Sequence, residues 1–203
     1  AHNGNIINDM DLARELPSNI NLSSTSDTEI MGWVIKNSEG RNWEDKILTS
    51  FNKFQGAFSM ISLTKNKLIA FRDTFGFRPL VLGQLNDSYV VCSETCALDT
   101  VGAKFIREVA PGEKIVIDDK GMRSVGKIRS PKKAFCLFEY VYLARPDSIF
   151  DKQLVHQVRQ RSGEILAHES PVGADMVVAV PDSGTSAAIG YSKASGIPYG
   201  EVL

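Results

Sequence analysis

Asn3 and Gly4 are adjacent residues whose types suit the stabilisation of a reacting carbonyl group. An Asn side chain supplies an N–H donor, and Gly allows a backbone N–H to approach a carbonyl oxygen closely. Together they could form an oxyanion hole, which binds the negative charge that develops on that oxygen. Asn-Gly is also a common surface-turn dipeptide, so this pair alone leaves both interpretations open.

Asp27 also has two interpretations, and they are compatible. It follows Ser26 at the start of a predicted helix, where a negative charge interacts favourably with the helix dipole. The same carboxylate could hold the ammonium group of a substrate.

Asp182, Ser183, Gly184 and Thr185 lie between a predicted strand and a predicted helix. Small residues at this position let backbone N–H groups face an anion, and the helix N-terminus adds a favourable field. A phosphate or pyrophosphate ligand is therefore one interpretation. The segment matches neither the Walker A motif nor G-x-G-x-x-G, so a tight turn without a ligand is the other.

The cysteines and histidines do not predict a complete metal site. Cys92 and Cys96 have a spacing that could suit a metal, but Cys92 lies in an apolar strand pattern and no matching pair follows. Cys136 stands among apolar and aromatic residues, which favours a buried thiol. The three histidines are widely scattered: His2, His156 and His168.

Helices are expected around the first two candidate sites. Asn8 is predicted to cap a helix that runs through Leu16, before Pro17. Ser26 and Glu29 have the spacing of a capping box, in which Ser26 accepts an early backbone N–H and Glu29 reaches back to the N-cap. The apolar face of that second helix is expected to comprise Ile30, Met31, Val34 and Ile35.

Short strands and turns follow, together with a short helix over Glu94–Val101, so a mostly antiparallel α+β domain is predicted. The expected strands are Ala57–Leu63, Leu68–Arg72, Pro79–Leu82, Tyr89–Cys92, Lys114–Asp118 and Met122–Ile128.

The pattern changes after a predicted linker at residues 130–133. Asp151–Glu169 is expected to be helical, with one apolar face, and Met176–Val180 is typical of a strand buried in a parallel sheet. Thr185–Ala194 is expected to be a helix that ends at Gly196. This order predicts the opening of a strand–loop–helix α/β unit. The apolar residues expected on the face of the first helix are Leu154, Val155, Val158, Ile165 and Leu166.

Composition excludes several classes of protein. The chain has 203 residues, 23 Lys and Arg against 24 Asp and Glu, and a formal net charge of -1. This balance is not that of a general nucleic-acid or anionic-membrane binder. No apolar run is long enough to span a bilayer, and three cysteines do not make a disulfide scaffold.

Read together, the segments resemble the amidophosphoribosyltransferase family of class II glutamine amidotransferases. The most diagnostic segment is Cys136–Ser148, and the resemblance runs through the whole chain. The other segments that carry it are Ala1–Asn5, Thr25–Glu29, Phe71–Asp73, Gly76–Leu80, Ser93–Asp99, Val109–Glu113 and Val178–Tyr199.

The resemblance implies an N-terminal-nucleophile glutaminase domain, a four-layer αββα sandwich, followed by the start of an α/β type I phosphoribosyltransferase domain. Residues 1–130 would be the glutaminase domain without its first part. Residues 131–148 would join the two domains, and residues 149–203 would open the second. A non-catalytic binding or regulatory module that resembles a glutamine amidotransferase is the alternative. Other glutamine-dependent synthases are disfavoured by Cys136–Ser148 and Val180–Thr185.

The resemblance also implies a reaction. Glutamine is hydrolysed in the first domain, and its ammonia displaces pyrophosphate from phosphoribosyl pyrophosphate in the second, giving 5-phosphoribosylamine for purine synthesis. Asn3 and Gly4 would form the oxyanion hole, and Asp27 would hold the α-ammonium of glutamine. Residues Asp182–Thr185 would lie along the pyrophosphate near Mg²⁺, with backbone contacts at Gly184.

Further expectations concern the whole protein. Cys136 matches a ligand of a [4Fe–4S] cluster in one branch of the family, and whether the whole protein holds a cluster stays open. The resemblance suggests a homotetramer that uses small-molecule substrates and neither nucleic acid nor membrane. Because the family's nucleophilic cysteine would precede Ala1, the 203-residue chain alone is expected to be inactive and loosely packed. Cytosol is the default compartment, with an organelle left open.

Overall fold

The computed structural model describes residues 1–130 and 132–202, which form two compact units. Unit 1 comprises Ala1–Ser93 and Lys104–Phe135, and unit 2 comprises Glu94–Ala103 and Cys136–Leu203. Pro131, within the predicted linker at residues 130–133, lies outside the described residues, as does Leu203. The predicted domain limits at residues 130 and 148 therefore stay predictions, and each unit is described by itself.

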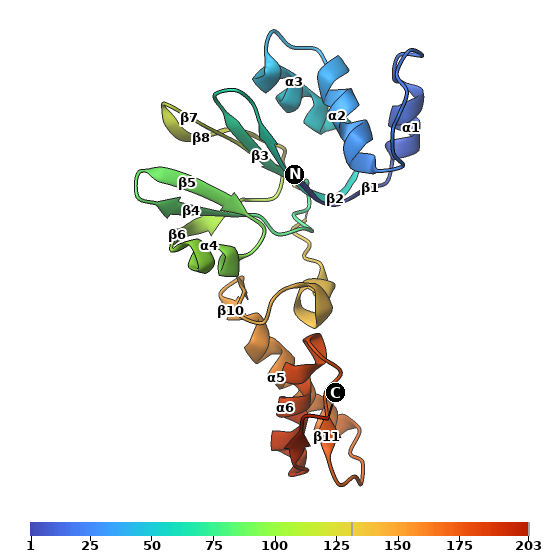
Figure 1. Ribbon diagram of the computed structural model, residues 1–203, viewed down its shortest axis with the longest axis vertical. Coiled ribbons are helices and arrows are strands. Elements are labelled where there is room, and N and C mark those ends of the chain that lie inside the picture. The colour runs from blue at the N-terminus through green and yellow to red at the C-terminus, as the bar shows by residue number, and fades with distance from the viewer. Residues whose placement is uncertain (131, 203) are drawn as a thin grey trace. The chain divides into compact units, whose positions relative to one another are not determined.

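Unit 1 is built from three helices and two antiparallel sheets (Figure 1). Over the described residues, one sheet has the strand order β1-β2-β3-β7-β8 and the other has β5-β4-β6. The helices are α1 (Asp9–Arg14), α2 (Asp27–Asn37) and α3 (Trp43–Ser50), followed by the short 3₁₀-helix η1 (Phe51–Lys53). The strands are β1 (His2–Ile6), β2 (Gly56–Leu63), β3 (Leu68–Arg72), β4 (Val81–Leu85), β5 (Ser88–Cys92), β6 (Lys104–Glu108), β7 (Glu113–Asp118) and β8 (Gly121–Lys127).

The larger sheet has a core on each face, because its strands alternate apolar side chains between the two sides. On β3, Ile69 and Phe71 face the helix layer, whereas Ala70 faces the smaller sheet. Unit 1 therefore has helix, sheet and sheet layers, three of the four expected in the predicted sandwich. The helix-side core also contains Ile30, Met31, Val34 and Ile35, the predicted face of α2.

The N-terminus of α2 confirms only half of the predicted capping box. The Ser26 side chain accepts from the Thr28 backbone N–H at 3.3 Å, as expected. Glu29 does not reach back to the N-cap. Its carboxylate instead accepts from the backbone and hydroxyl groups of Ser23 and Ser24, at 2.7–2.9 Å. The preceding serine loop offers more donors, so it outcompetes the single N-cap N–H.

Asn8 stands at the predicted N-cap of α1, but its side chain makes no capping hydrogen bond. Its amide instead donates to the Lys53 carbonyl at 2.9 Å and accepts from the Gln55 N–H at 3.1 Å. Asn8 thus ties α1 to the segment before β2.

Unit 2 is helical apart from short strand pairs. Its helices are α4 (Thr95–Val101), the π-helical turn η2 (Glu139–Leu143), α5 (Val155–Glu169) and α6 (Ser183–Ser195). Its strands are β9 (Ile149–Phe150), β10 (Gln153–Leu154), β11 (Val177–Val178) and β12 (Tyr199–Gly200). The strand–loop–helix order expected from the sequence is present, and a second strand, β12, follows α6 and pairs with β11 in parallel. Gly196 ends α6 in the left-handed conformation, as predicted.

Helices α5 and α6 pack closely through two glycines. A Cβ on Gly163 would lie 1.9 Å from the Ala187 carbonyl oxygen, and one on Gly190 would lie 2.0 Å from that of Gln160. This contact corrects the predicted face of α5. Ile165 and Leu166 are exposed, since the helix turns its small residues toward α6 and not its largest apolar ones.

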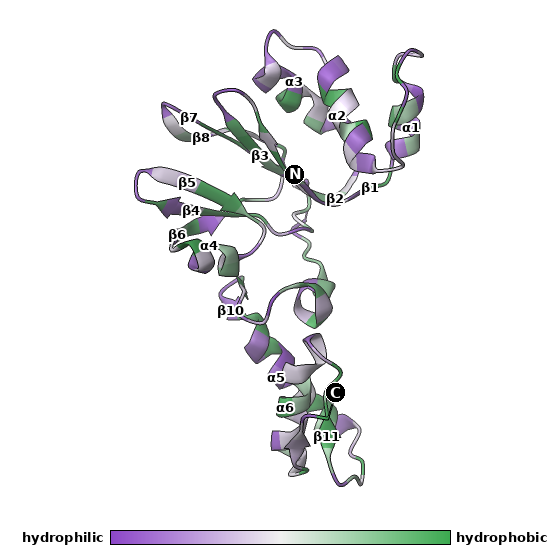
Figure 2. Ribbon diagram, in the orientation of Figure 1, coloured by the Kyte–Doolittle hydropathy of each residue, from purple (hydrophilic) through white to green (hydrophobic). Residues whose placement is uncertain are grey.

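The strand predicted over Met176–Val180 is shorter and less buried than expected. Only Val177 and Val178 form β11, and Val180 is 74% exposed. Within residues 132–202, β11 pairs with β12 alone, so its outer apolar residues have no second strand beside them. Figure 2 shows that β11 is hydrophobic.

Candidate functional site

Strand β1 carries Asn3 and Gly4, so the surface-turn interpretation of this dipeptide is wrong. Asn3 pairs with Ser59 and Gly4 with Phe58 of β2. Gly4 has φ = 125°, and a Cβ there would meet the Ala57 carbonyl oxygen at 2.0 Å. Gly is thus required at this position by both conformation and space. The space that a Cβ would fill is taken by β2, so this glycine lets the two strands approach each other closely.

The Asn3 side chain is held at both ends of its amide. Its Oδ1 accepts from Arg78 Nε at 3.0 Å and from the terminal Nη2 of Arg78 at 2.7 Å. Its Nδ2 donates to Ser93 Oγ at 3.1 Å. An amide nitrogen carries two N–H groups, so one remains beyond the Ser93 bond for another acceptor.

Asp27 is tied to the same strand. Its Oδ2 accepts from the Ile6 backbone N–H at 3.1 Å, and its Oδ1 accepts from the Thr28 hydroxyl at 3.3 Å. Its position in the first turn of α2 confirms the structural interpretation of this residue. The structure therefore brings all three predicted residues of unit 1 to β1.

His2 joins this group, although the sequence pattern indicated no site for it. Its Nδ1 lies 2.9 Å from Thr28 Oγ1 and 3.5 Å from Asp27 Oδ1. The Thr28 hydroxyl thus lies between His2 and Asp27, within hydrogen-bond distance of both side chains. Burial lowers the pKa of His2, and the attraction of Asp27 opposes this by raising it.

The predicted pyrophosphate-binding residues fall at the N-terminus of α6. Asp182 and Thr185 line a cavity of about 230 Å³ that is also lined by Pro181 and the end of β12. The cavity lies beside the ends of two parallel strands and a helix N-terminus, an arrangement common in anion sites of α/β proteins. Glu201 adds a second carboxylate to its lining.

The other two predicted loop residues line a different cavity. Ser183 and Gly184 border a space of about 280 Å³ next to η2 and α5. The four residues therefore share one turn but open onto two cavities, a distinction that sequence spacing does not predict.

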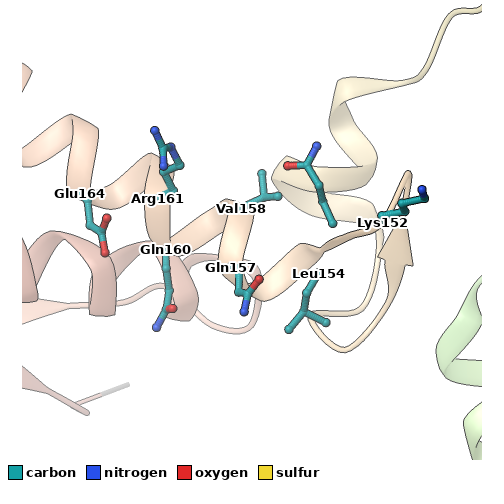
Figure 3. Close-up of a pocket in the computed structure, with 8 residues that line it drawn as sticks. Lys152, Leu154, Gln157, Val158, Gln160, Arg161 and Glu164 are labelled. Atoms are coloured by element: carbon teal, nitrogen blue, oxygen red, sulfur yellow. The ribbon is translucent and has the colours of Figure 1, made fainter.

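A third cavity, of about 410 Å³, runs along the outer side of α5 (Figure 3). It includes no residue predicted to act on a substrate. Its charged side chains are Lys152, Arg161 and Glu164.

The cysteines do not form a metal centre within residues 1–130 and 132–202. Cys92, Cys96 and Cys136 are free thiols, and these ranges contain no cluster of three or more His, Cys, Asp or Glu residues suited to a metal. His156 is engaged with Ser186 Oγ at 2.8 Å. Burial raises the pKa of Cys96, as expected for a thiol in the core.

Comparisons with known proteins agree with this geometry. The family model described as "Glutamine amidotransferase domain" matches residues 1–100. A solved structure described as the allosteric regulatory enzyme of purine biosynthesis superposes with a TM-score of 0.91 at 43% identity, covering 99% of this chain and 43% of that one. The glutamine phosphoribosylpyrophosphate amidotransferase of B. subtilis, complexed with ADP and GMP, gives 0.89 at 43% identity, with 99% and 44% covered.

The curated relatives extend the match to several lineages. The amidophosphoribosyltransferase of Bacillus subtilis is 44% identical over 98% of this chain and 42% of its own length. That of Archaeoglobus fulgidus is 43% identical, covering 100% and 45%. The chain belongs to the amidophosphoribosyltransferase family.

Two further facts concern the extent of the match and membrane-spanning helices. The chain spans about two fifths of the length of these amidophosphoribosyltransferases. Over the described part of the sequence, no helix combines the length and the apolarity needed to cross a bilayer.

Proposed function

We propose that the protein containing this chain is an amidophosphoribosyltransferase of purine synthesis. Water and glutamine give glutamate and ammonia at the unit 1 site. Ammonia then attacks C1 of phosphoribosyl pyrophosphate, the C1–O bond to pyrophosphate breaks, and one proton leaves the nitrogen. The products are 5-phosphoribosylamine and pyrophosphate. The pairing of a glutamine amidotransferase match with a parallel strand–helix unit supports the two half-reactions.

The Asn3 amide, which is held by hydrogen bonds to Arg78 and Ser93, is the observation that supports glutamine hydrolysis at this site. Hydrolysis of a carboxamide develops negative charge on its oxygen, and preorganised N–H donors stabilise that charge. Asn3 Nδ2 retains one N–H beyond its bond to Ser93, and the Gly4 backbone N–H is the proposed second donor. Asp27, fixed by the Ile6 N–H, supplies the negative charge that suits the α-ammonium of glutamine.

The turn before α6 supports the second half-reaction, in which ammonia displaces pyrophosphate from phosphoribosyl pyrophosphate. Helix N–H groups favour the pyrophosphate, while Asp182 and Glu201 offer carboxylate oxygens in the same cavity. Carboxylates together with substrate phosphates are the donor set that Mg²⁺ prefers. These two residues are therefore the proposed protein ligands of Mg²⁺, which would neutralise charge on the departing pyrophosphate.

An iron–sulfur cluster does not fit the described residues by themselves. A [4Fe–4S] cluster takes four thiolates, and Cys136 has no companion cysteine grouped with it. We keep Cys136 as a proposed cluster ligand for the whole protein and assign no chemical step to the cluster.

Assembly and compartment complete the proposal. We assign a homotetramer, which sedimentation of the complete protein would test. The cytosol is the proposed compartment, and a plastid is the alternative, because chloroplastic relatives of Glycine max and Arabidopsis thaliana are 44% identical.

The proposed function is tested by comparing two nitrogen donors in the complete protein. Wild-type protein is expected to form phosphoribosylamine from either glutamine or ammonia. Asn3→Ala should lower the glutamine-dependent kcat by about 10²–10³-fold and leave the ammonia-dependent rate unchanged. Wild-type protein that uses neither donor would favour the non-catalytic binding module.

A further inference from the structure

Arg78 fixes the orientation of the Asn3 amide through its guanidinium group. Two guanidinium hydrogen bonds, from Nε at 3.0 Å and from Nη2 at 2.7 Å, go to the same Asn3 oxygen, Oδ1. A guanidinium has five donors and no acceptor, so it can bond only the oxygen end of an amide. The alternative amide orientation would place an NH₂ group against those donors and is excluded.

This orientation has a chemical consequence. With Oδ1 toward Arg78, the NH₂ end of Asn3 lies toward Ser93. Only this end can donate to a developing oxyanion. The positive charge of Arg78 also draws electron density toward Oδ1, which makes the Nδ2 hydrogens better donors.

Arg78 is itself held by a supporting network. Its backbone carbonyl accepts from Arg72 Nε at 2.7 Å and from Ser59 Oγ at 3.0 Å. Arg72 is buried, with 1% of its surface exposed, and it also donates to the Gly76 carbonyl at 2.8 Å. The end of β3 therefore fixes where the Arg78 side chain begins.

The Asp73 carboxylate stabilises the loop at residues 73–78, which leads from β3 to Arg78. It accepts backbone N–H bonds from Phe75, Gly76 and Phe77 at 2.8–2.9 Å. Moving Arg78 away from Asn3 would therefore require the loop at residues 73–78 to break hydrogen bonds that are buried or partly buried. Such a cost is typical of a preorganised site.

We propose that Arg78 is a positioning residue, which orients the Asn3 amide so that its NH₂ end faces the reacting carboxamide oxygen. This inference rests on the proposed glutamine hydrolysis. Arg78 acts through Asn3, because its guanidinium donates two hydrogen bonds to Oδ1. Its loss should therefore weaken stabilisation of the transition state more than binding of glutamine.

The test measures glutamine-dependent and ammonia-dependent kinetics of Arg78 variants in the complete protein. Arg78→Met, which removes the donors and keeps much of the side-chain volume, should lower the glutamine-dependent kcat by about tenfold to hundredfold. The KM for glutamine should change less than threefold. Arg78→Lys, which retains one charged donor, should recover part of the lost rate and serves if the Met variant fails to fold.

Arg107 provides a matched control. It also makes two guanidinium bonds to one partner, Glu113, at 2.8 Å each, within unit 1 but away from Asn3. Arg107→Met should leave the ratio of glutamine-dependent to ammonia-dependent rates unchanged.

The outcomes separate the two proposals. Wild-type protein that uses ammonia but not glutamine overturns the proposed glutamine reaction. If wild type uses glutamine and Arg78→Met retains its kcat, the positioning role alone is overturned. A rise in KM with an unchanged kcat also overturns it, because that result would indicate direct binding of the substrate by Arg78. A fall of both rates in parallel would indicate a general structural role and has the same consequence.

Discussion

At the residue scale, side chains in the unit 1 site bond to other protein groups and retain capacity to bond to a substrate. Asp27 uses one oxygen for the Ile6 N–H and the other for the Thr28 hydroxyl. Since a carboxylate oxygen has two lone pairs, each can accept a further bond. A residue that begins a helix can therefore also hold an ammonium group.

Asp27→Asn is expected to raise the KM for glutamine at least tenfold with a smaller effect on kcat. The amide retains an acceptor for the Ile6 N–H but loses the negative charge that attracts the ammonium group. Steady-state kinetics with glutamine would measure this, and the ammonia-dependent rate is the internal control. An unchanged KM would remove Asp27 from the substrate site.

Gly4→Ala should lower the free energy of unfolding by at least about 2 kcal/mol, because the left-handed backbone and the Ala57 carbonyl both oppose a Cβ. Gly32→Ala is the matched control. Gly32 lies in α2 with open space around it, so its substitution should be neutral or stabilising by up to about 1 kcal/mol. Equal denaturant midpoints for the two variants would contradict the packing argument.

At the element scale, the start of α2 shows how a helix terminus is stabilised by the loop before it. The Glu29 carboxylate accepts from Ser23 and Ser24, and these bonds lower its pKa to about 2. Hydrogen bonds to the charged form are the cause, with the backbone N–H of Ser23 the largest. The loop and the helix are thus coupled through an ionised side chain.

This coupling predicts a pH dependence of stability. Because the folded-state pKa is about 2 and the ordinary value is 4.5, the stabilisation is present above pH 4.5 and declines as the pH falls toward 2. Glu29→Gln should unfold more easily than wild type at pH 7, and the difference should shrink over that window. Chemical denaturation at stepped pH measures it, with the exposed Glu39→Gln as control. A constant difference at every pH would contradict the assignment.

The α5–α6 pair gives a second prediction at this scale. Gly163→Ala should destabilise unit 2 by about 1–3 kcal/mol, because the added Cβ forces the helices apart. Gly173→Ala, in open space, is the control. Circular dichroism during denaturation would measure both, and similar stabilities would mean that the helices separate at little cost.

At the scale of the whole molecule, the chain crosses between its units more than once. Helix α4 follows β5 and precedes β6, yet it belongs to unit 2. Glu94 at its N-cap accepts from the Arg145 N–H at 2.9 Å and from Ser148 Oγ at 2.7 Å. Thr95 Oγ1 accepts from the Ile149 N–H at 2.8 Å. Polar contacts therefore join α4 to the Cys136–Ser148 segment that carries the family resemblance.

Glu94→Ala should accordingly loosen α4 together with β9 and β10. Amide hydrogen exchange is expected to accelerate at α4 and at residues 145–154, with no change in β4–β6. Ser88→Ala, in β5, is the control for a substitution in unit 1. Faster exchange in β4–β6 with α4 unaffected would place α4 with unit 1.

Local patterns predicted the elements better than the sites. Leu68–Arg72 is a strand with the predicted bounds, and the α2 face is buried as expected, because period and propensity act over a few residues. The burial of α5 was predicted wrongly, since its neighbour is known only once α6 is placed. The place of His2 in the site could not be predicted either, because its partners at residues 27 and 28 are distant in the chain.

By itself, the sequence determined the family, the mostly antiparallel character of unit 1 and the residue types able to stabilise an oxyanion. Each of these depends on composition, short motifs or local periodicity. Only the tertiary structure decided that Arg78 and Ser93 hold opposite ends of the Asn3 amide, across separations of 75 and 90 residues. The physical reason is that an amide has no preferred orientation of its own, and the groups that select one meet only when the chain folds.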